Sequence, residues 1–296
     1  MIVSASRRTD IPAYYMSWFM NRVAAGWCDV PNPYNPRQVS RLSLRREDVE
    51  AFVFWTRAPG ALSEALPKLD GMDYPSYATI TVTAYPKDLE PFLPPLERRL
   101  DDFRRLSDLA GPRRCVWRYD PVILSNWTND AWHRETFGRI ARALQGHSSR
   151  VVLSYLDLYR KTGRRLRKLE TEGFRLAGHE PLSPAVSSLM RDLAAIAAEH
   201  GFSAQTCAEE DTAESWKISP GRCIDPGLLN DIYGLKLPCR KDPGQRKACL
   251  CTVSRDMGIA DTCLAGCAYC YATSSHEAAA ARRKRHSPGA SALLGV

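Results

Sequence analysis

Residues 115–121 read Cys-Val-Trp-Arg-Tyr-Asp-Pro, and a helical pattern over residues 130–144 follows them. The β-branched and aromatic residues at 115–119 predict a buried strand, and the helical pattern ends just before Gly146. A second strand pattern, Val151–Tyr155, follows the helix. Strand, helix and strand in this order predict two parallel strands joined by a covering helix.

The same alternation extends through residues 2–207. Two more helical patterns, Tyr14–Ala25 and Ser183–His200, end at Gly26 and Gly201. No glycine-rich dinucleotide fingerprint follows a strand, and six or seven such units suit a closed or partly closed sheet. The sequence therefore predicts an α/β fold, a parallel-stranded barrel or partial barrel (TIM-like, six to seven strands). The predicted strands are Ile2–Ser4, Val39–Leu42, Phe52–Trp55, Thr79–Thr83, Cys115–Tyr119, Val151–Tyr155 and Ser203–Cys207.

The composition is that of a globular protein, with 296 residues, 44% hydrophobic and 25% charged. Arg7 and Arg8 come before any long apolar run, so no secretory signal is expected. The longest helical apolar run, Leu193–Ala198, is far shorter than the ~20 residues that span a bilayer. We therefore expect a cytoplasmic protein with no membrane partner.

The net charge of +8 makes nucleic acid a candidate partner. Four of these charges lie at residues 282–285, in a segment (278–296) that is rich in Ala, Ser and Gly, and we expect that segment to be a disordered basic tail. Trp55, Trp117 and Trp127 could stack on bases beside arginines, although packing in the core explains tryptophans equally well.

The densest chemical signal is the C-x3-C-x2-C motif of Cys263, Cys267 and Cys270, with Tyr269 before its last cysteine. Three thiolates on one loop can hold three corners of a 4Fe-4S cluster and leave the fourth iron open. Ten cysteines in a reducing compartment favour metal or cluster binding over disulfides. Zinc is the alternative, because the Cys267–Cys270 pair could be completed by two cysteines at positions 249 and 251.

Residues 263–270 resemble the cluster loop of the radical S-adenosylmethionine enzymes, C-x3-C-x-aromatic-C. Nearly the whole chain also resembles an uncharacterised bacterial family, domain of unknown function 1848, whose members carry radical-SAM-like cysteines near the carboxyl terminus. The segments that carry this second resemblance are 6–10, 54–56, 117–121, 223–225 and 241–272.

The resemblance implies a radical-SAM-like enzyme with a 4Fe-4S cluster, S-adenosylmethionine as cofactor and an electron donor as partner. Its substrate, a small molecule or a nucleic acid, is not implied. In ordinary radical SAM proteins the cluster loop follows the first strand, whereas here it follows the last. Both loops would open on the same rim of a barrel.

A second cluster is a further hypothesis. Cys207 lies at a predicted strand end, Cys223 follows a Gly-Arg turn, and Cys249 and Cys251 alternate along the chain. Four such thiolates would close a cluster suited to electron relay. The alternative is that Cys207 and Cys223 are buried thiols that pack as small apolar groups. The remaining cysteines are Cys239, a spare ligand, and Cys28 and Cys115, which we expect in the core.

In parallel α/β barrels the functional residues lie at the carboxyl ends of the strands. Arg7 and Asp10 follow the first predicted strand, and Arg118 and Asp120 follow the fifth, so these four are our candidate catalytic residues. The candidate cofactor-binding residues are Ser254, Asp256, Tyr269 and Glu209.

The predicted organisation is a barrel-like domain at 1–240, a cysteine-rich segment at 241–277 on its mouth, and the tail at 278–296. Two other functions fit the same features: an iron–sulfur protein that binds or repairs nucleic acid, and a redox sensor or zinc-binding structural protein.

Overall fold

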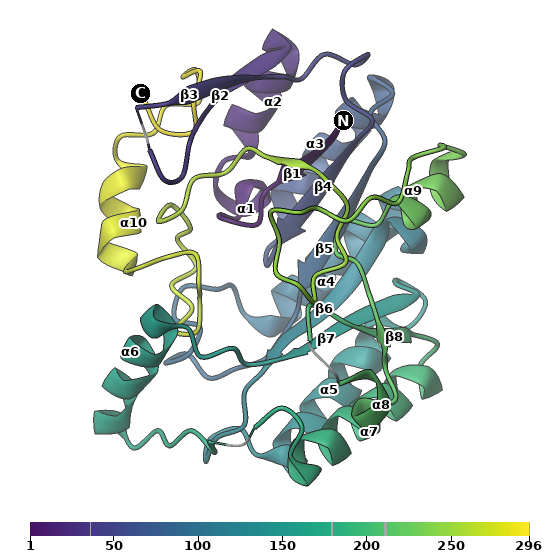
Figure 1. Cartoon of the computed structure of the whole chain (residues 1–296), viewed down its shortest axis with the longest axis vertical. Helices are drawn as coiled ribbons and strands as arrows, with labels where there is room; N and C mark the ends of the chain where they lie inside the picture. Colours follow the sequence, from purple (N-terminus) through teal and green to yellow (C-terminus); the bar gives the residue numbers. More distant parts are fainter. Residues whose placement is uncertain (36, 179, 210–211, 296) are drawn as a thin grey trace.

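The computed structural model describes residues 1–35, 37–178, 180–209 and 212–295. Its centre is an eight-stranded sheet in the order β10-β1-β4-β5-β6-β7-β8-β9, in which every neighbouring pair is parallel (Figure 1). The predicted α/β fold is confirmed, and the open order of the sheet is consistent with a partial barrel. The strands are β1 (Ile2–Ala5), β4 (Ala51–Thr56), β5 (Ser76–Thr81), β6 (Cys115–Val122), β7 (Arg150–Tyr155), β8 (Ser203–Thr206), β9 (Ser219–Pro220) and β10 (Arg255–Asp256).

Several helices begin at a capping side chain. Helix α5 (Asp130–Leu144) has the predicted bounds, and the Asn129 side chain caps it by accepting from the amide of Trp132. The other helices are α1 (Ile11–Tyr14), α2 (Met16–Ala25), α3 (Gly60–Gly71), α4 (Leu96–Ala110), α6 (Arg160–Leu169), α7 (Pro184–Glu199), α8 (Ala213–Trp216), α9 (Pro226–Tyr233) and α10 (His276–Arg283), with 3-10 turns at Pro112–Arg114 and Glu170–Glu172. No helix among the described residues has the length and apolar character needed to cross a bilayer.

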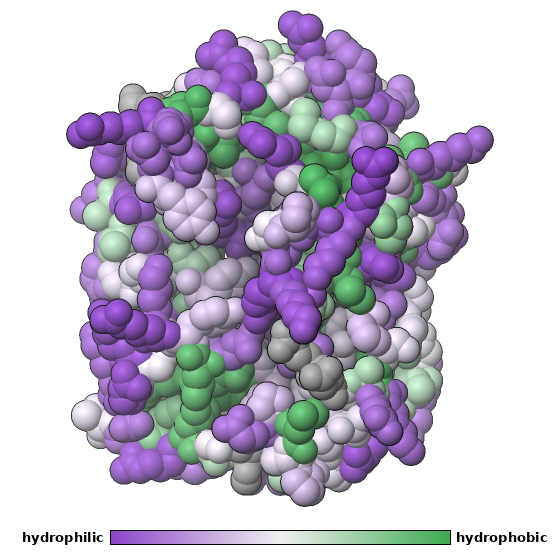
Figure 2. All heavy atoms as spheres, viewed as in Figure 1, coloured by the Kyte–Doolittle hydropathy of each residue, from purple (hydrophilic) through white to green (hydrophobic). Residues whose placement is uncertain are grey.

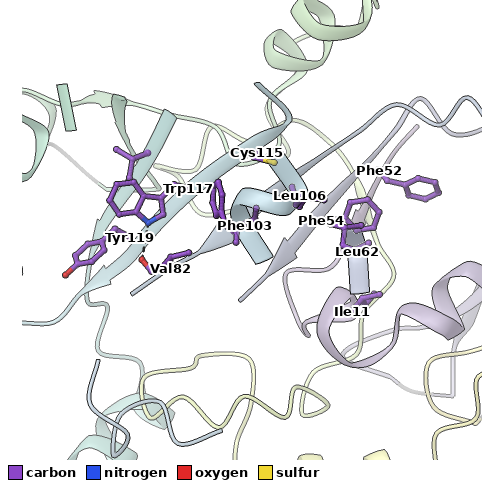
Figure 3. Packing of buried hydrophobic residues seen from close by; sticks show 14 of the residues in the cluster. Ile11, Phe52, Phe54, Leu62, Val82, Phe103, Leu106, Cys115, Trp117 and Tyr119 are labelled. Carbon is purple, nitrogen blue, oxygen red and sulfur yellow. Dashed lines mark hydrogen bonds between the residues drawn. The ribbon is translucent and has the colours of Figure 1, made fainter. Parts of the chain in front are cut away.

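Alternate strand residues sort onto the two faces of the sheet, as the two-residue period of a strand requires. On one face, residues such as Phe52, Phe54 and Trp117 pack against the helices in a single core, which Figure 3 shows with Phe103 of α4 among them. On the other face, Val53, Tyr77, Val116 and their neighbours pack against a segment that contains Cys223, Ile224, Cys249 and Cys251. The helices therefore cover one face, and the chain after β9 covers the other.

One predicted strand does not belong to the sheet. Val39–Leu42 lies in β3 (Val39–Ser43), which pairs antiparallel with β2 (Trp27–Pro31) in a separate hairpin. The connection at residues 32–38 is too short for the crossover that a parallel pair needs, so the two strands form a hairpin.

The prediction of a disordered tail is wrong. Helix α10 is capped by Ser275, and the chain after it returns to the β2–β3 hairpin, where the carboxyl terminus lies in Figure 1. The Trp18 indole donates to the carbonyl of Ala290 (3.0 Å), the Asp29 amide donates to the carbonyl of Ser291 (2.9 Å), and Leu293 is fully buried. Hydrogen bonds to the main chain and a buried leucine thus dock this segment, although it is rich in Ala, Ser and Gly. Figure 2 shows that hydrophilic residues dominate the visible surface, with apolar side chains in separate patches.

Removing one buried methylene from this segment is expected to destabilise the whole protein. Leu293→Val should lower the free energy of unfolding by about 1 kcal/mol, because a buried methylene contributes about 0.8 kcal/mol. Urea unfolding of the full chain measures it. Leu294→Val, at a half-buried neighbour, is the matched control and should cost less. Equal stability of wild type and Leu293→Val would contradict the docking of this segment.

Candidate functional site

A cavity of about 510 Å3 opens where the carboxyl ends of the strands meet the cysteine-rich segment. Residues in or just after the carboxyl-terminal halves of β1, β4, β5, β6, β7 and β8 line it, which is the edge where parallel α/β folds place functional groups. All of the cysteines predicted to bind metal reach this one cavity, although they come from distant parts of the chain: Cys207, Cys223, Cys249, Cys251, Cys263, Cys267 and Cys270.

The loop that carries Cys263, Cys267 and Cys270 is held by its backbone. Gly266 has φ +70°, a left-handed conformation that glycine adopts without strain, and the amide of Ala268 donates to the carbonyl of Leu89 (2.9 Å). Hydrogen bonds to the main chain leave the three thiols free to face the cavity.

Arg165 of α6 ties the same loop to the rest of the protein. Its guanidinium donates to the carbonyls of Ala268 (Nε, 2.8 Å) and Ser274 (Nη1, 3.1 Å), and also to those of Cys270 and Thr273. One side chain thus satisfies four carbonyls along the loop, and it fixes the position of the last cysteine.

Among the loop cysteines, Cys267 is buried, and Cys263 and Cys270 are partly buried. Burial raises the pKa of Cys267 to about 12, and it also raises the pKa of Cys263 well above its ordinary value. Thiolates at these positions therefore require a cationic partner, as metal ligands do.

The other four cysteines are neighbours through their sulfur atoms. The Sγ atoms of Cys207 and Cys223 lie 3.0 Å apart, and the amide of Ile224 donates to Sγ of Cys251 (3.3 Å). A hydrogen bond from the thiol of Cys251 lowers the pKa of Cys249 to about 7 in spite of its burial. Across the described residues, no group of three or more His, Cys, Asp or Glu side chains is arranged to hold a metal ion.

The cysteines left out of these two sets lie elsewhere. Cys28 and Cys115 are buried in the core, as expected, whereas Cys239 is exposed and does not line the cavity.

The four candidate catalytic residues all line the cavity, but each is already engaged. Arg118, which is only 6% exposed, donates through Nη1 to Sγ of Cys223 (2.7 Å) and through Nη2 to Asp120. Asp120 also accepts from the hydroxyl of Ser154. Burial raises the pKa of Asp120, but Arg118 and Ser154 outweigh it, so this carboxyl stays ionised with a lowered pKa.

Asp10 and Arg7 have positioning contacts. Asp10 caps α1 by accepting from the amide of Ala13 (2.9 Å) and also accepts from the amide of Arg57 (2.8 Å). Burial raises the pKa of Asp10 to about 6. The guanidinium of Arg7 lies 3.2 Å from Oγ of Ser254, 3.9 Å from a carboxylate oxygen of Asp256 and 4.0 Å from one of Asp242, and Arg7 also lines the cavity.

Of the candidate cofactor-binding residues, only Tyr269 lines the cavity. Asp256 lies in β10, where it accepts from the hydroxyls of Ser4 (2.8 Å) and Ser6 (2.6 Å) and so joins β10 to the end of β1. Ser254 binds Arg7, and Glu209 accepts from the amide of Tyr155 (2.8 Å) with a pKa that burial raises to about 8. These three side chains hold the structure around the site and are not part of its wall.

The sequence did not identify a buried polar network under the cysteine loop. Glu90 (2% exposed) accepts from the hydroxyl of Thr83 (2.6 Å), from Arg57 and from the hydroxyl of Tyr269, and it lies 3.7 Å from Arg99. Arg57 and Tyr269 both line the cavity. No spacing in the sequence relates Glu90 to the cysteines, because the contacts join positions far apart in the chain.

The tryptophans offer little for stacking on nucleic acid. Trp117 is fully buried and stacks on Phe137 in the core, and Trp127 packs against Phe174. Trp55 alone of the three lines the cavity.

The similarity of the chain to known sequences is at the level of a protein family. No curated protein matches the chain in sequence. The matched region begins in β1 and ends just after the cysteine loop, so it contains the sheet and every cysteine of the cavity. Over residues 2–272 the sequence matches the model of the family described as Domain of unknown function (DUF1848), and the chain belongs to that family.

Proposed function

We propose that this protein is a radical-SAM-like iron–sulfur enzyme, in which Cys263, Cys267 and Cys270 hold an open-site 4Fe-4S cluster at the mouth of a TIM-like partial barrel. The observation that carries the proposal is that these three thiols face one cavity at the carboxyl ends of parallel strands. Its volume, about 510 Å3, lies within the range of small-molecule sites, roughly 300–1,000 Å3.

The donor set suits the cluster chemically. The three thiols are free of disulfides, lie in one short loop and have the soft character that iron–sulfur clusters require. When bound and reduced by an external electron donor, such a cluster supplies the electron that cleaves S-adenosylmethionine to methionine and a 5′-deoxyadenosyl radical.

The protein's own residues provide the binding site for cofactor and substrate. Arg7 and Arg8 line the cavity after β1, and the guanidinium of Arg8 donates to the carbonyl of Gly258 over a long distance (3.4 Å). These two cations are suited to a carboxylate or phosphate of a bound molecule. Trp55 and Tyr271 also line the cavity and offer flat apolar surfaces. Arg118 and Asp120 form an ion pair with each other. We therefore propose that they shape the wall of the cavity and do not transfer protons.

Cleavage of S-adenosylmethionine is the direct test. Anaerobically reconstituted and reduced protein is expected to form methionine and 5′-deoxyadenosine, measured by chromatography with mass detection. Cys267→Ser should reduce product to the background of the reductant alone, because one corner of the cluster loses its thiolate. Cys239→Ser, at an exposed cysteine outside the cavity, is the matched control and should keep the wild-type rate. A reconstituted protein that contains iron and sulfide but forms neither product would refute the proposed function.

A further inference from the structure

Four thiols outside the cysteine loop come together from three separate segments. Cys207 follows β8, Cys223 follows β9, and Cys249 and Cys251 lie in the segment that covers the sheet face opposite the helices. Cys207 and Cys223 are in sulfur–sulfur contact (3.0 Å), and all four line the cavity. None of the four forms a disulfide.

The surroundings of these cysteines are not those of buried thiols that pack as small apolar groups. Cys223, Cys249 and Cys251 are 6%, 8% and 3% exposed, so their sulfur atoms are largely withdrawn from water. Yet polar donors are directed at two of them: Nη1 of Arg118 lies 2.7 Å from Sγ of Cys223, and the amide of Ile224 lies 3.3 Å from Sγ of Cys251. A buried guanidinium against a sulfur atom is favourable when the sulfur carries negative charge. N–H groups directed at ligand sulfurs are also one of the ways in which proteins tune iron–sulfur clusters.

We infer that Cys207, Cys223, Cys249 and Cys251 form a second iron–sulfur site, closed by four thiolates and facing the same cavity as the loop cluster. The assignment of an iron–sulfur cluster to this site rests on the proposed function. The proximity of the four thiols is a feature of the fold and does not depend on that function. Four thiolates outweigh the positive charge of a cubane cluster, so the bound site is an anion. Arg118, at 6% exposure and shared with Asp120, is a buried cation that offsets part of this negative charge.

The two sites are structurally independent. The loop of Cys263, Cys267 and Cys270 packs in a cluster with Leu89, Ile123 and Phe174, whereas Cys223, Cys249 and Cys251 pack with Val53, Tyr77 and Val116 of the sheet. Loss of one set of ligands should therefore leave the other in place. A closed cluster that faces the same cavity is placed to pass electrons toward the loop cluster or a bound substrate.

Iron and acid-labile sulfide per chain, after anaerobic reconstitution, separate the possibilities. Three forms of the full chain are compared: wild type, the loop variant Cys263→Ala/Cys267→Ala/Cys270→Ala, and the pair variant Cys207→Ser/Cys249→Ser. We expect about eight iron atoms in wild type and about four in each variant, with matching sulfide. Cys239→Ser is the control and should match wild type. Circular dichroism of each variant verifies its fold, and the loop variant alone decides the question if the pair variant does not fold.

Each other result has a definite meaning. About four iron atoms in wild type and none in the loop variant would overturn the second site and leave the proposed function standing. About four in both wild type and the loop variant, lost in the pair variant, would support the second site and refute the loop cluster. Zinc without sulfide in the loop variant would overturn the inference in favour of a structural zinc site.

Discussion

Gly266→Ala is expected to displace the cysteine loop and to remove its iron, although the substitution touches no ligand. A Cβ at this position would lie 2.4 Å from Cδ2 of Phe92 and 3.2 Å from Cγ of Pro91. Overpacking of this kind costs about 1–3 kcal/mol. The left-handed backbone adds a further ~1–3 kcal/mol for a residue with a side chain. A penalty of this size falls on one short loop, so it should shift that loop from the position that gathers Cys263, Cys267 and Cys270.

The measurements are the iron content after reconstitution and the free energy of unfolding in urea. Gly71→Ala is the matched control, because nothing lies within 4 Å of a Cβ there and its backbone is not left-handed. The double variant Gly266→Ala/Phe92→Ala removes the clash but keeps the backbone cost, so it should recover part of the loss. Phe92 is 53% exposed, which keeps its own truncation inexpensive. Full iron occupancy in Gly266→Ala would show that the loop is not held as described.

The sheet and the longer helices could be predicted because their signals are local. An apolar run such as Val151–Tyr155 or the pattern of α5 is complete within its own segment, and the parallel order follows from the alternation. The same logic placed Arg7 and Arg118 at one edge, since parallel strands end on the same side. The cysteine motif identified its own loop for the same reason.

Contacts between distant segments could not be predicted. Asp256 lies near the cysteines in sequence, but pairing of β10 with β1 directs it to Ser4 and Ser6 instead of the cavity. Arg165 belongs to a basic helix that would be taken for a solvated surface, yet it binds the cysteine loop. The segment after α10 becomes ordered through Trp18, a residue more than 270 positions earlier. Each of these contacts depends on which surfaces meet after folding. The spacing of residues along the sequence does not contain that information.

The buried network of Glu90 is where such distant contacts should matter most. Its carboxylate joins Arg57 after β4, Thr83 after β5 and Tyr269 of the cysteine loop, and Arg99 of α4 lies within 3.7 Å. Arg99 is only 3% exposed, and burial lowers its pKa. Among the described residues, Glu90 is the one carboxylate within ion-pair distance of both guanidinium groups.

Glu90→Gln keeps the shape of the side chain and removes its charge. Breaking a buried ion pair by neutralising one partner costs about 3–5 kcal/mol, because the remaining charge stays buried without compensation. Urea unfolding should show that the variant is less stable than wild type by this amount. The difference between the two proteins should change little in 1 M salt, since buried ion pairs are weakly screened. Tyr269→Phe removes one hydrogen bond to the same charged carboxylate and should cost less, ~1.5–3 kcal/mol.

Glu97→Gln, on the exposed side of α4, is the charge-matched control and should cost less than ~1 kcal/mol, the size of a first-turn carboxylate's interaction with the helix dipole. Because Tyr269 lies between Cys267 and Cys270, Glu90→Gln should also lower iron retention by the loop in proportion to its loss of stability, while Glu97→Gln should not. A Glu90→Gln protein within 1 kcal/mol of wild type would mean that the two arginines are compensated elsewhere. In that case the network would not be what positions the cysteine loop against the ends of β4 and β5.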